Sequence, residues 1–215
     1  MLVRYKFMLL EYLPSITALL AIQLLGLMSP GPDFAIVVRN SLIYSRKTAI
    51  FTAIGVALGI LVHLAYIICG LGVIIAKTIW LFSLFKYIGA AYLIYIGCKG
   101  LCAKKQKFLY QETSRQKQDI SALKAISTGI LTNATNPKAM LFFLSLISAF
   151  ITPKEPTFVV ITYGALIFLS TLIWFLFVAM CFSHQRLRSF FKNFQYLIER
   201  VTGGFLVLLG LKMLL

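Results

Sequence analysis

Two short segments place charged side chains beside prolines within otherwise apolar sequence. The first reads Pro30-Gly31-Pro32-Asp33 and the second reads Asn136-Pro137-Lys138. Proline interrupts a helix because it lacks an N–H, yet it suits the first turn of a new one. A carboxylate can bind an ammonium group or a proton, and an ammonium group can bind a carboxylate. The two segments therefore predict two helix breaks, each with a charge that could hold a ligand.

The composition shows what surrounds these breaks. Of 215 residues, 60% are hydrophobic and 13% are charged. Soluble domains carry roughly 25% charged residues, so this chain lacks the polar surface that a globule in water needs. It is predicted to be an integral membrane protein whose partner is the lipid bilayer.

The apolar stretches are long enough to cross a membrane. Roughly 20 apolar residues span a hydrocarbon core of about 30 Å. Strand-like alternation of polar and apolar residues is absent, so helices are favoured over a barrel. The first stretch is followed by Pro-Gly-Pro-Asp rather than a small-residue cleavage site, so a retained helix is favoured over a signal peptide. Six spans are predicted, at residues 14–38, 48–76, 80–100, 124–150, 157–182 and 197–215.

The basic residues that give the chain its net charge of +15 are concentrated in the predicted loops. Fourteen of the 21 Lys and Arg residues fall at the loops between spans 1–2, 3–4 and 5–6, and six fall on the other side. This asymmetry predicts that the three basic loops, including 102–123, are cytoplasmic and that both termini are outside. We therefore interpret the basic residues as a topology signal rather than as a surface that binds nucleic acid. A calmodulin-like or lipid-binding role of loop 102–123 is the lesser alternative.

Two halves of the chain resemble each other. The segment "YIGAAYLIYIGCKGL" at 87–101 aligns with "RVTGGFLVLLGLKML" at 200–214, which pairs Gly97 with Gly210 and Lys99 with Lys212. Pro32 likewise aligns with Pro137. Three spans per half is an odd number, so the halves must have opposite orientations, as in inverted-repeat transporters. The prediction is one all-α membrane domain, 1–215, with repeats at 14–101 and 124–215 and the first helix of each broken at proline.

The breaks fall near the bilayer midplane. Pro32 lies roughly 10 Å of helix from Arg39, and Pro137 lies roughly 20 Å from Lys124, against a half-thickness near 15 Å. Gly31 and Asn136 are predicted to cap the new helices. A helix start offers free N–H groups to a carboxylate. An amino acid, zwitterionic or cationic, would suit such a site. The predicted substrate- or ion-binding residues are Pro30, Gly31, Pro32, Asp33, Asn133, Asn136, Pro137 and Lys138.

Structural alternatives stay open for several of these residues. Asp33 and Lys138 could form an ion pair without a transport role. Asn133 could make a helix-to-helix hydrogen bond instead of lining a cavity. His63, within the uncharged second span, is a candidate proton relay, and a hydrogen-bonded packing histidine explains it equally well.

At these residues the sequence resembles the LysE/RhtB family of amino-acid exporters. The resemblance covers "SPGPDFAIVVRNSLIYSRKTAIFTAIGVALG" (29–59), "GILTNATNPKAMLFFLSLISAF" (129–150) and "GAAYLIYIGCKGL" (89–101) with its echo at 203–214. It implies a multi-pass bacterial inner-membrane protein that exports amino acids or their derivatives, driven by proton exchange. It points to the same break residues, although the family often has Asn at the position of Asp33.

Other classes fit less well. A membrane thiol–disulfide electron carrier can share a broken-helix repeat, but it needs one cysteine per half near the breaks, and Cys69 and Cys181 lie far along the chain from them. Intramembrane hydrolysis needs a His-Glu-x-x-His pair or two aspartates within spans. No enzyme activity, cofactor or metal is therefore expected. A non-transporting scaffold stays an alternative, and small-residue faces allow a homodimer.

Overall fold

The computed structural model of the chain describes residues 2–77, 79–103, 118–151 and 155–214. Most of the predicted basic loop 102–123 thus lies outside the described residues. Helices are the regular secondary structure of the described part, in the order α1 (Leu2–Met28), α2 (Pro32–Ile43), α3 (Arg46–Lys77), α4 (Ile79–Leu101), α5 (Ala122–Ala134), α6 (Pro137–Phe150), α7 (Thr157–Phe182) and α8 (Gln185–Leu214).

Both predicted breaks are present. The first separates α1 from α2, and the two helices are bent by 57° at this point. The second separates α5 from α6. Each new helix begins at the predicted proline, Pro32 or Pro137.

Most other boundaries agree with the predicted segments to within about two residues, and three do not. The predicted first segment ended at residue 38, whereas α2 ends at Ile43. The predicted sixth segment began at residue 197, whereas α8 begins at Gln185, and α1 begins at Leu2 rather than residue 14. The sequence argument ended spans before charged residues such as Arg39 and Arg186. Helical hydrogen bonding does not stop at a charge, and residues 185–202 contain neither proline nor glycine.

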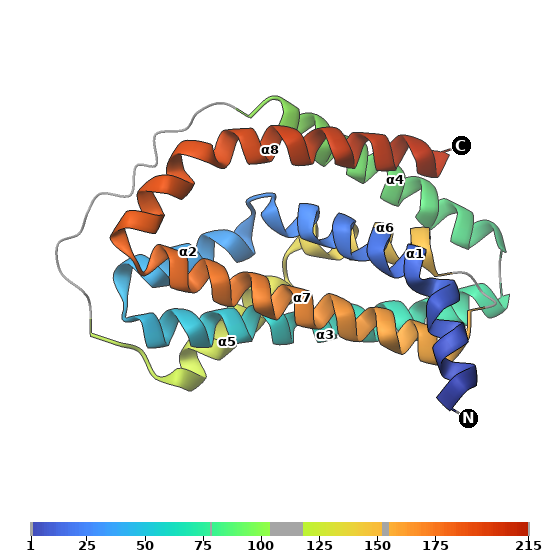
Figure 1. Ribbon diagram of the computed structural model, residues 1–215, viewed down its shortest axis with the longest axis horizontal. Helices are drawn as coiled ribbons and strands as arrows, with labels where there is room; N and C mark the ends of the chain where they lie inside the picture. The colour runs from blue at the N-terminus through green and yellow to red at the C-terminus, as the bar shows by residue number, and fades with distance from the viewer. Residues whose placement is uncertain (1, 78, 104–117, 152–154, 215) are drawn as a thin grey trace.

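The helices form layers along one long axis (Figure 1). Helices α4 and α8 lie against each other on one face, and α3, α5 and α7 lie on the opposite side, with α1, α2 and α6 between. Helix α1 begins and α8 ends at the same end of the molecule.

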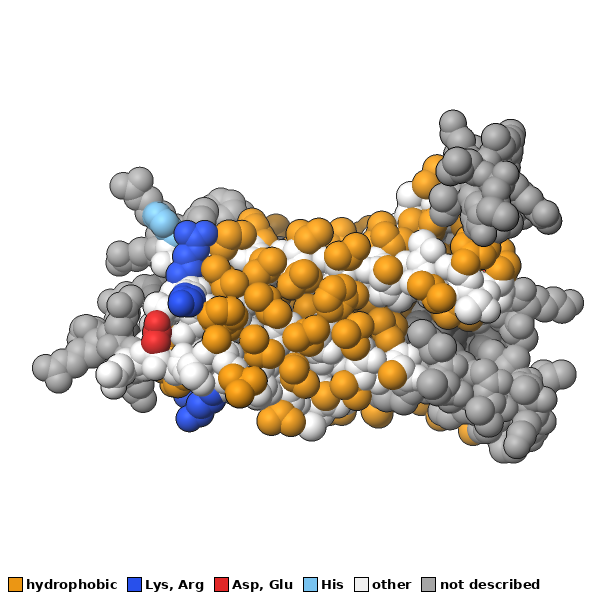
Figure 2. Space-filling model, turned by 90° about the horizontal axis from the view of Figure 1, so that it is seen from below, with side chains coloured by type: hydrophobic (Ala, Val, Ile, Leu, Met, Phe, Trp, Pro, Cys, Tyr) orange, Lys and Arg blue, Asp and Glu red, His pale blue; other side chains and the backbone are white. Residues whose placement is uncertain are grey.

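Three segments of the described chain have the length and apolarity of membrane spans. They are Arg46–Ala65 in α3, Thr157–Phe182 in α7 and the bent pair Tyr12–Met28 with Pro32–Ile43. Two further apolar helices, Tyr87–Leu101 and Pro137–Leu146, are shorter than a full span. Figure 2 shows hydrophobic side chains covering the flank of the molecule, with basic side chains at one end. The protein is therefore a helical membrane protein, and six spans stay a prediction.

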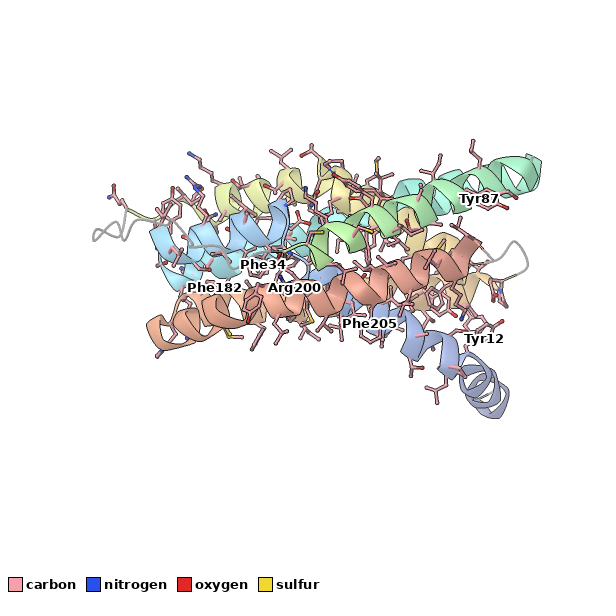
Figure 3. The ribbon with its side chains drawn as sticks, turned by 90° about the horizontal axis from the view of Figure 1, so that it is seen from above. Tyr12, Phe34, Tyr87, Phe182, Arg200 and Phe205 are labelled. Carbon is pink, nitrogen blue, oxygen red and sulfur yellow. The ribbon has the colours of Figure 1, made fainter. Side chains whose placement is uncertain are left out.

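The apolar core has two parts on either side of the breaks. One part joins α2, α3 and α7 through residues such as Val37, Ala53 and Val178. In it Phe34 packs edge-on against Phe182, with ring centroids 5.6 Å apart (Figure 3). The other part joins α1, α3, α4, α6, α7 and α8. The polar groups of the breaks lie where these two parts meet.

An aspartate outside the spans ties two turns together. Asp119 accepts hydrogen bonds from the Ser45 hydroxyl, from the Ser45 amide at 2.8 Å and from Thr48 Oγ1 at 3.1 Å. These bonds, chiefly that of the Ser45 side chain, hold the pKa of the Asp119 carboxyl below its ordinary value. The stabilisation is thus fully present above the unfolded-state pKa and is lost as the pH falls through the lower, folded-state pKa.

Helices α4 and α8 approach closely because glycines face each other across their interface. A methyl group at Gly203 would lie 2.5 Å from the carbonyl oxygen of Gly97, and one at Gly97 would lie 2.6 Å from the carbonyl oxygen of Gly203. Close backbone approach through small residues is a usual mode of helix packing in membranes.

This contact predicts different effects for two adjacent glycines. Gly203→Ala should destabilise the protein by about 1–3 kcal/mol, because the added methyl group forces two backbones apart. A methyl group at Gly204 would lie 3.8 Å from Leu101 Cδ2, which is an ordinary contact distance, so Gly204→Ala should cause no loss of stability. Thermal unfolding of the purified protein in detergent measures both. Equal losses at the two positions would contradict the α4–α8 packing.

Candidate functional site

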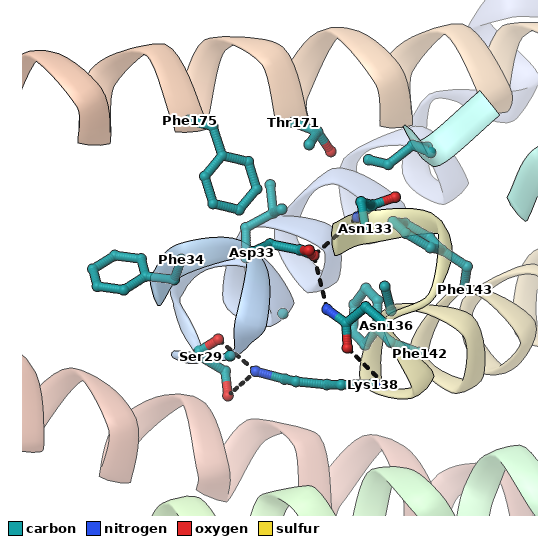
Figure 4. Close-up of a pocket in the computed structure, with 15 residues that line it drawn as sticks. Ser29, Asp33, Phe34, Asn133, Asn136, Lys138, Phe142, Phe143, Thr171 and Phe175 are labelled. Atoms are coloured by element: carbon teal, nitrogen blue, oxygen red, sulfur yellow. Dashed lines mark hydrogen bonds between the residues drawn. The ribbon is translucent and has the colours of Figure 1, made fainter. Parts of the chain in front are cut away.

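The two breaks meet around a small buried cavity of about 40 Å³. Residues from α1, α2, α3, α5, α6 and α7 line it. Figure 4 shows Asp33 between the end of α5 and the inward-facing Thr171 and Phe175 of α7. The breaks that were separate in the sequence therefore form one site.

Asp33 is held by the second break. Its side chain is 9% exposed, and its Oδ2 accepts hydrogen bonds from Asn133 Nδ2 at 2.9 Å and Asn136 Nδ2 at 3.0 Å (Figure 4). Its Oδ1 is buried and has no donor among the described residues. Asp33 also lies in the first turn of α2, where the helix dipole favours a negative charge.

Asn136 has two roles at once. Its Oδ1 accepts the amide of Lys138 at 3.0 Å, which is the cap predicted for the start of α6. Its Nδ2 donates to Asp33. The cap thereby fixes the orientation of the amide that holds the carboxylate.

Lys138 is held by the first break. Its Nζ donates to the backbone oxygen of Ser29, to Ser29 Oγ at 2.9 Å and to the backbone oxygen of Pro30 at 3.0 Å. Gly31 allows this approach, since a methyl group there would lie 3.0 Å from Lys138 Cδ. The ammonium is thus directed to the carbonyl end of α1, which a positive charge stabilises, rather than to Asp33.

His63 joins the site through the backbone. It is fully buried, and its Nε2 lies 2.8 Å from the carbonyl oxygen of Asn133. A carbonyl only accepts, so Nε2 carries the proton of this bond. His63 does not line the cavity. It reaches Asp33 by way of Asn133, and its role as a proton relay stays a prediction.

The remaining predicted residues divide between two places. Gly31, Asn133 and Asn136 line the small cavity with Asp33 and Lys138. Pro30 and Pro32 line a second cavity on the side of α4 and α8. Pro137 begins α6, is exposed and lines neither cavity. Asn133 makes a helix-to-helix hydrogen bond to Asp33 and also lines the cavity, so the two alternatives predicted for it are compatible.

The sequence argument missed part of the site. Thr171 lines the cavity and accepts a hydrogen bond from Gln23 Nε2 at 3.0 Å, and both side chains are fully buried. Polar residues inside apolar spans were the available signal for both. Ser29, which accepts a hydrogen bond from Lys138, was not among the predicted binding residues. Phe175 and Phe142 carried no signal, because aromatic residues are common throughout the chain.

Cysteine or metal chemistry finds no support at this site. Cys98, Cys102 and Cys181 are free, and none of these three lines either cavity. Within the described residues, no three His, Cys, Asp or Glu side chains are grouped to hold a metal. The electron-carrier alternative is therefore not supported.

The double role of Asn136 predicts a specific weakness. Asn136→Ala should lower the stability of the protein by about 1–3 kcal/mol, because the α6 amide loses its cap and Asp33 loses a donor. The neighbouring Thr135 bonds within its own helical turn, to the Leu131 carbonyl at 2.7 Å, and is the matched control. Thermal unfolding in detergent compares Asn136→Ala with Thr135→Ala, and a smaller loss at Asn136 would contradict this account.

Comparison with known proteins gives a matching family model and related membrane proteins. The family model described as LysE type translocator matches residues 24–215, which include both breaks. The threonine efflux protein of Escherichia coli (strain K12) is 30% identical over 194 residues, covering 90% of this chain and 94% of that protein. The uncharacterized membrane protein YrhP of Bacillus subtilis (strain 168) is 31% identical over 204 residues, covering 92% and 97%.

No solved structure is significantly similar to this chain. The family model, however, covers nearly all of it, and both relatives match almost their full lengths. The resemblance found from the sequence is thereby confirmed: the protein belongs to the LysE type translocator family and is a membrane-embedded transporter rather than an enzyme.

Proposed function

We propose that the protein exports a small amino acid, or a close derivative, across the bacterial inner membrane in exchange for protons. The two helix breaks form its substrate site. The family and the similarity to a threonine efflux protein support the substrate class.

The observation that carries this proposal is a lack of hydrogen-bond donors at the cavity. Asp33 Oδ1 and Asn133 Oδ1 are buried acceptors without a donor in the described part of the chain. Buried acceptors are normally satisfied, and an unsatisfied one costs about 1–3 kcal/mol. An ammonium group supplies three donors and a positive charge for the carboxylate. The amino group of the substrate is therefore assigned to Asp33.

The carboxylate of the substrate has partners on the other side of the break. The first amides of α2 have no partner within that helix, and a helix start favours an anion. Lys138, at the start of α6, supplies a positive charge nearby. A zwitterion can thus satisfy the groups that each break leaves open.

Proton exchange follows from competition for Asp33. A carboxylate can hold the substrate ammonium or a proton, but both at once would leave one of them without a negative partner. Release of the substrate outside frees the carboxylate for a proton, which then returns inward. This alternation couples export to the proton gradient with one group.

Contacts between α4 and α8 support an inverted repeat. Gly97 lies against the backbone of Gly203 and the side chain of Val207. In the alignment of the two halves, which is shifted by 113 positions, Gly210 is the counterpart of Gly97, and Ala90 and Ile94 are the counterparts of Gly203 and Val207. Gly210 does lie against Ala90 and Ile94, so the equivalent contacts are also present. Such local two-fold symmetry is expected where two inverted halves meet, and rocking of the halves would alternate access to the site.

Export by intact cells tests the function. Cells overexpressing the protein should release at least one member of a labelled amino-acid panel that includes threonine, and dissipating the proton gradient should slow this release. Asp33→Asn should reduce export by about tenfold or more, because a charged hydrogen bond is lost. Asp119→Asn removes a carboxylate outside the cavity and is the matched control. Export at an unchanged rate after the proton gradient is dissipated would exclude proton exchange. Failure to export any amino acid of the panel would exclude the proposed function.

The proposed topology has its own test. The basic loops are proposed to face the cytoplasm, so an impermeant thiol reagent added to intact cells should label Thr157→Cys but not Gln118→Cys. Both positions are exposed, and the native cysteines are first replaced. Labelling of Gln118→Cys alone would reverse the orientation.

A further inference from the structure

A second cavity of about 320 Å³ lies between the first break and helices α4 and α8. Tyr92, Tyr95 and Lys99 of α4 and Glu199 of α8 line it, together with Lys138 of α6. Figure 3 shows α4 and α8 running along this face of the molecule. Arg200 of α8 donates to the carbonyl oxygen of Ala103 at 3.0 Å, which ties the two helices together next to the cavity.

Ser29, Gly31 and Lys138 line both cavities. They therefore form the partition between the small inner cavity and this outer one. The three donors of the Lys138 ammonium match the three acceptors it binds, two on Ser29 and one on Pro30. These bonds hold the partition closed.

The sizes of the cavities decide where a substrate fits in this conformation. The inner cavity, at about 40 Å³, has room for only a few water molecules at roughly 10–15 Å³ each. The outer cavity, at about 320 Å³, is within the range of roughly 300–1,000 Å³ found for small-molecule sites. An amino acid can enter the outer cavity while the inner one is closed.

The charges around the outer cavity match those of an amino acid. Lys99, Lys138 and Glu199 line the same cavity, so the two ammonium groups repel each other and the carboxylate attracts both. Two ammonium groups and one carboxylate leave this wall with an excess of positive charge. A ligand carboxylate would relieve the repulsion between the lysines, and a ligand ammonium would be attracted by Glu199.

We propose that the outer cavity is the first binding site of the substrate and that the substrate opens the partition. The amino acid places its carboxylate between Lys99 and Lys138 and its ammonium at Glu199. The carboxylate competes with the Ser29 and Pro30 carbonyls for Lys138. Once Lys138 turns to the substrate, the partition loses its bonds and the path to Asp33 opens. This inference rests on the proposed export of an amino acid.

The test measures transport into inside-out membrane vesicles over a range of concentrations of an amino acid that the wild-type protein exports. Lys99→Gln and Glu199→Gln should each raise KM about tenfold, with smaller effects on the maximal rate. Lys212→Gln is the matched control, because Lys212 is the repeat counterpart of Lys99 and does not line the cavity. Poor folding would lower the amount of active protein and hence the maximal rate, but not KM.

A competitor separates the role of the carboxylate. If threonine is transported, 1-amino-2-propanol, which is threonine without its carboxylate, should inhibit at least about tenfold more weakly than threonine itself. Equal inhibition would overturn the competition for Lys138. Unchanged KM in Lys99→Gln and Glu199→Gln, or an equal rise in Lys212→Gln, would overturn the outer site while leaving export intact. Absence of transport by the wild type would instead refute the proposed function.

Discussion

The constraint on which the structure depends is that a helix interrupted inside a membrane must find new partners for its free backbone groups. Each unsatisfied group in hydrocarbon costs several kcal/mol. Here each break is completed by side chains from elsewhere. Lys138 binds the carbonyl oxygens at the end of α1, His63 binds the Asn133 carbonyl oxygen, and Asn136 caps α6 while it binds Asp33. Lys138 of the second break thus completes the first, and the amides of Asn133 and Asn136 bind the carboxylate of the first break.

The hydrogen bonds of Asp33 and Lys138 therefore couple the two breaks to each other. Moving one break relative to the other stretches the bonds of Asp33 and Lys138 together, so the partners must be exchanged as a set. A ligand that carries both charges can replace these partners at the moment they separate. Under the proposed mechanism, the groups that hold the two breaks together are also the groups that a zwitterion binds, and this would link binding to movement.

Local chemistry explains what the sequence could predict. Proline determines where a helix can begin, so both breaks and the role of Asn136 as a cap were predictable. The residues at which α8 and α1 begin were not, because charges mark the edge of the membrane but do not end a helix. The partner of Lys138 was also beyond the sequence. Asp33 was a natural candidate by charge, but the carbonyl end of α1 comes within reach only through the packing of α1 on α6. The outer cavity depends on α4 and α8 in the same way.

A purely structural role for Asp33 is hard to reconcile with its surroundings. Both available amides, of Asn133 and Asn136, donate to the same oxygen, Oδ2. A carboxylate kept only to brace two helices would be expected to have donors at both oxygens, since its burial costs energy whether or not it has a function. Next to it, Asn133 Oδ1 also lacks a donor in the described chain. The ammonium of Lys138 donates instead to Ser29 and Pro30, just after the end of α1. The cavity is short of donors and not of acceptors. A proton or a ligand that carries N–H groups would correct this imbalance, and these are the two species that the proposed exchange of an amino acid for a proton requires.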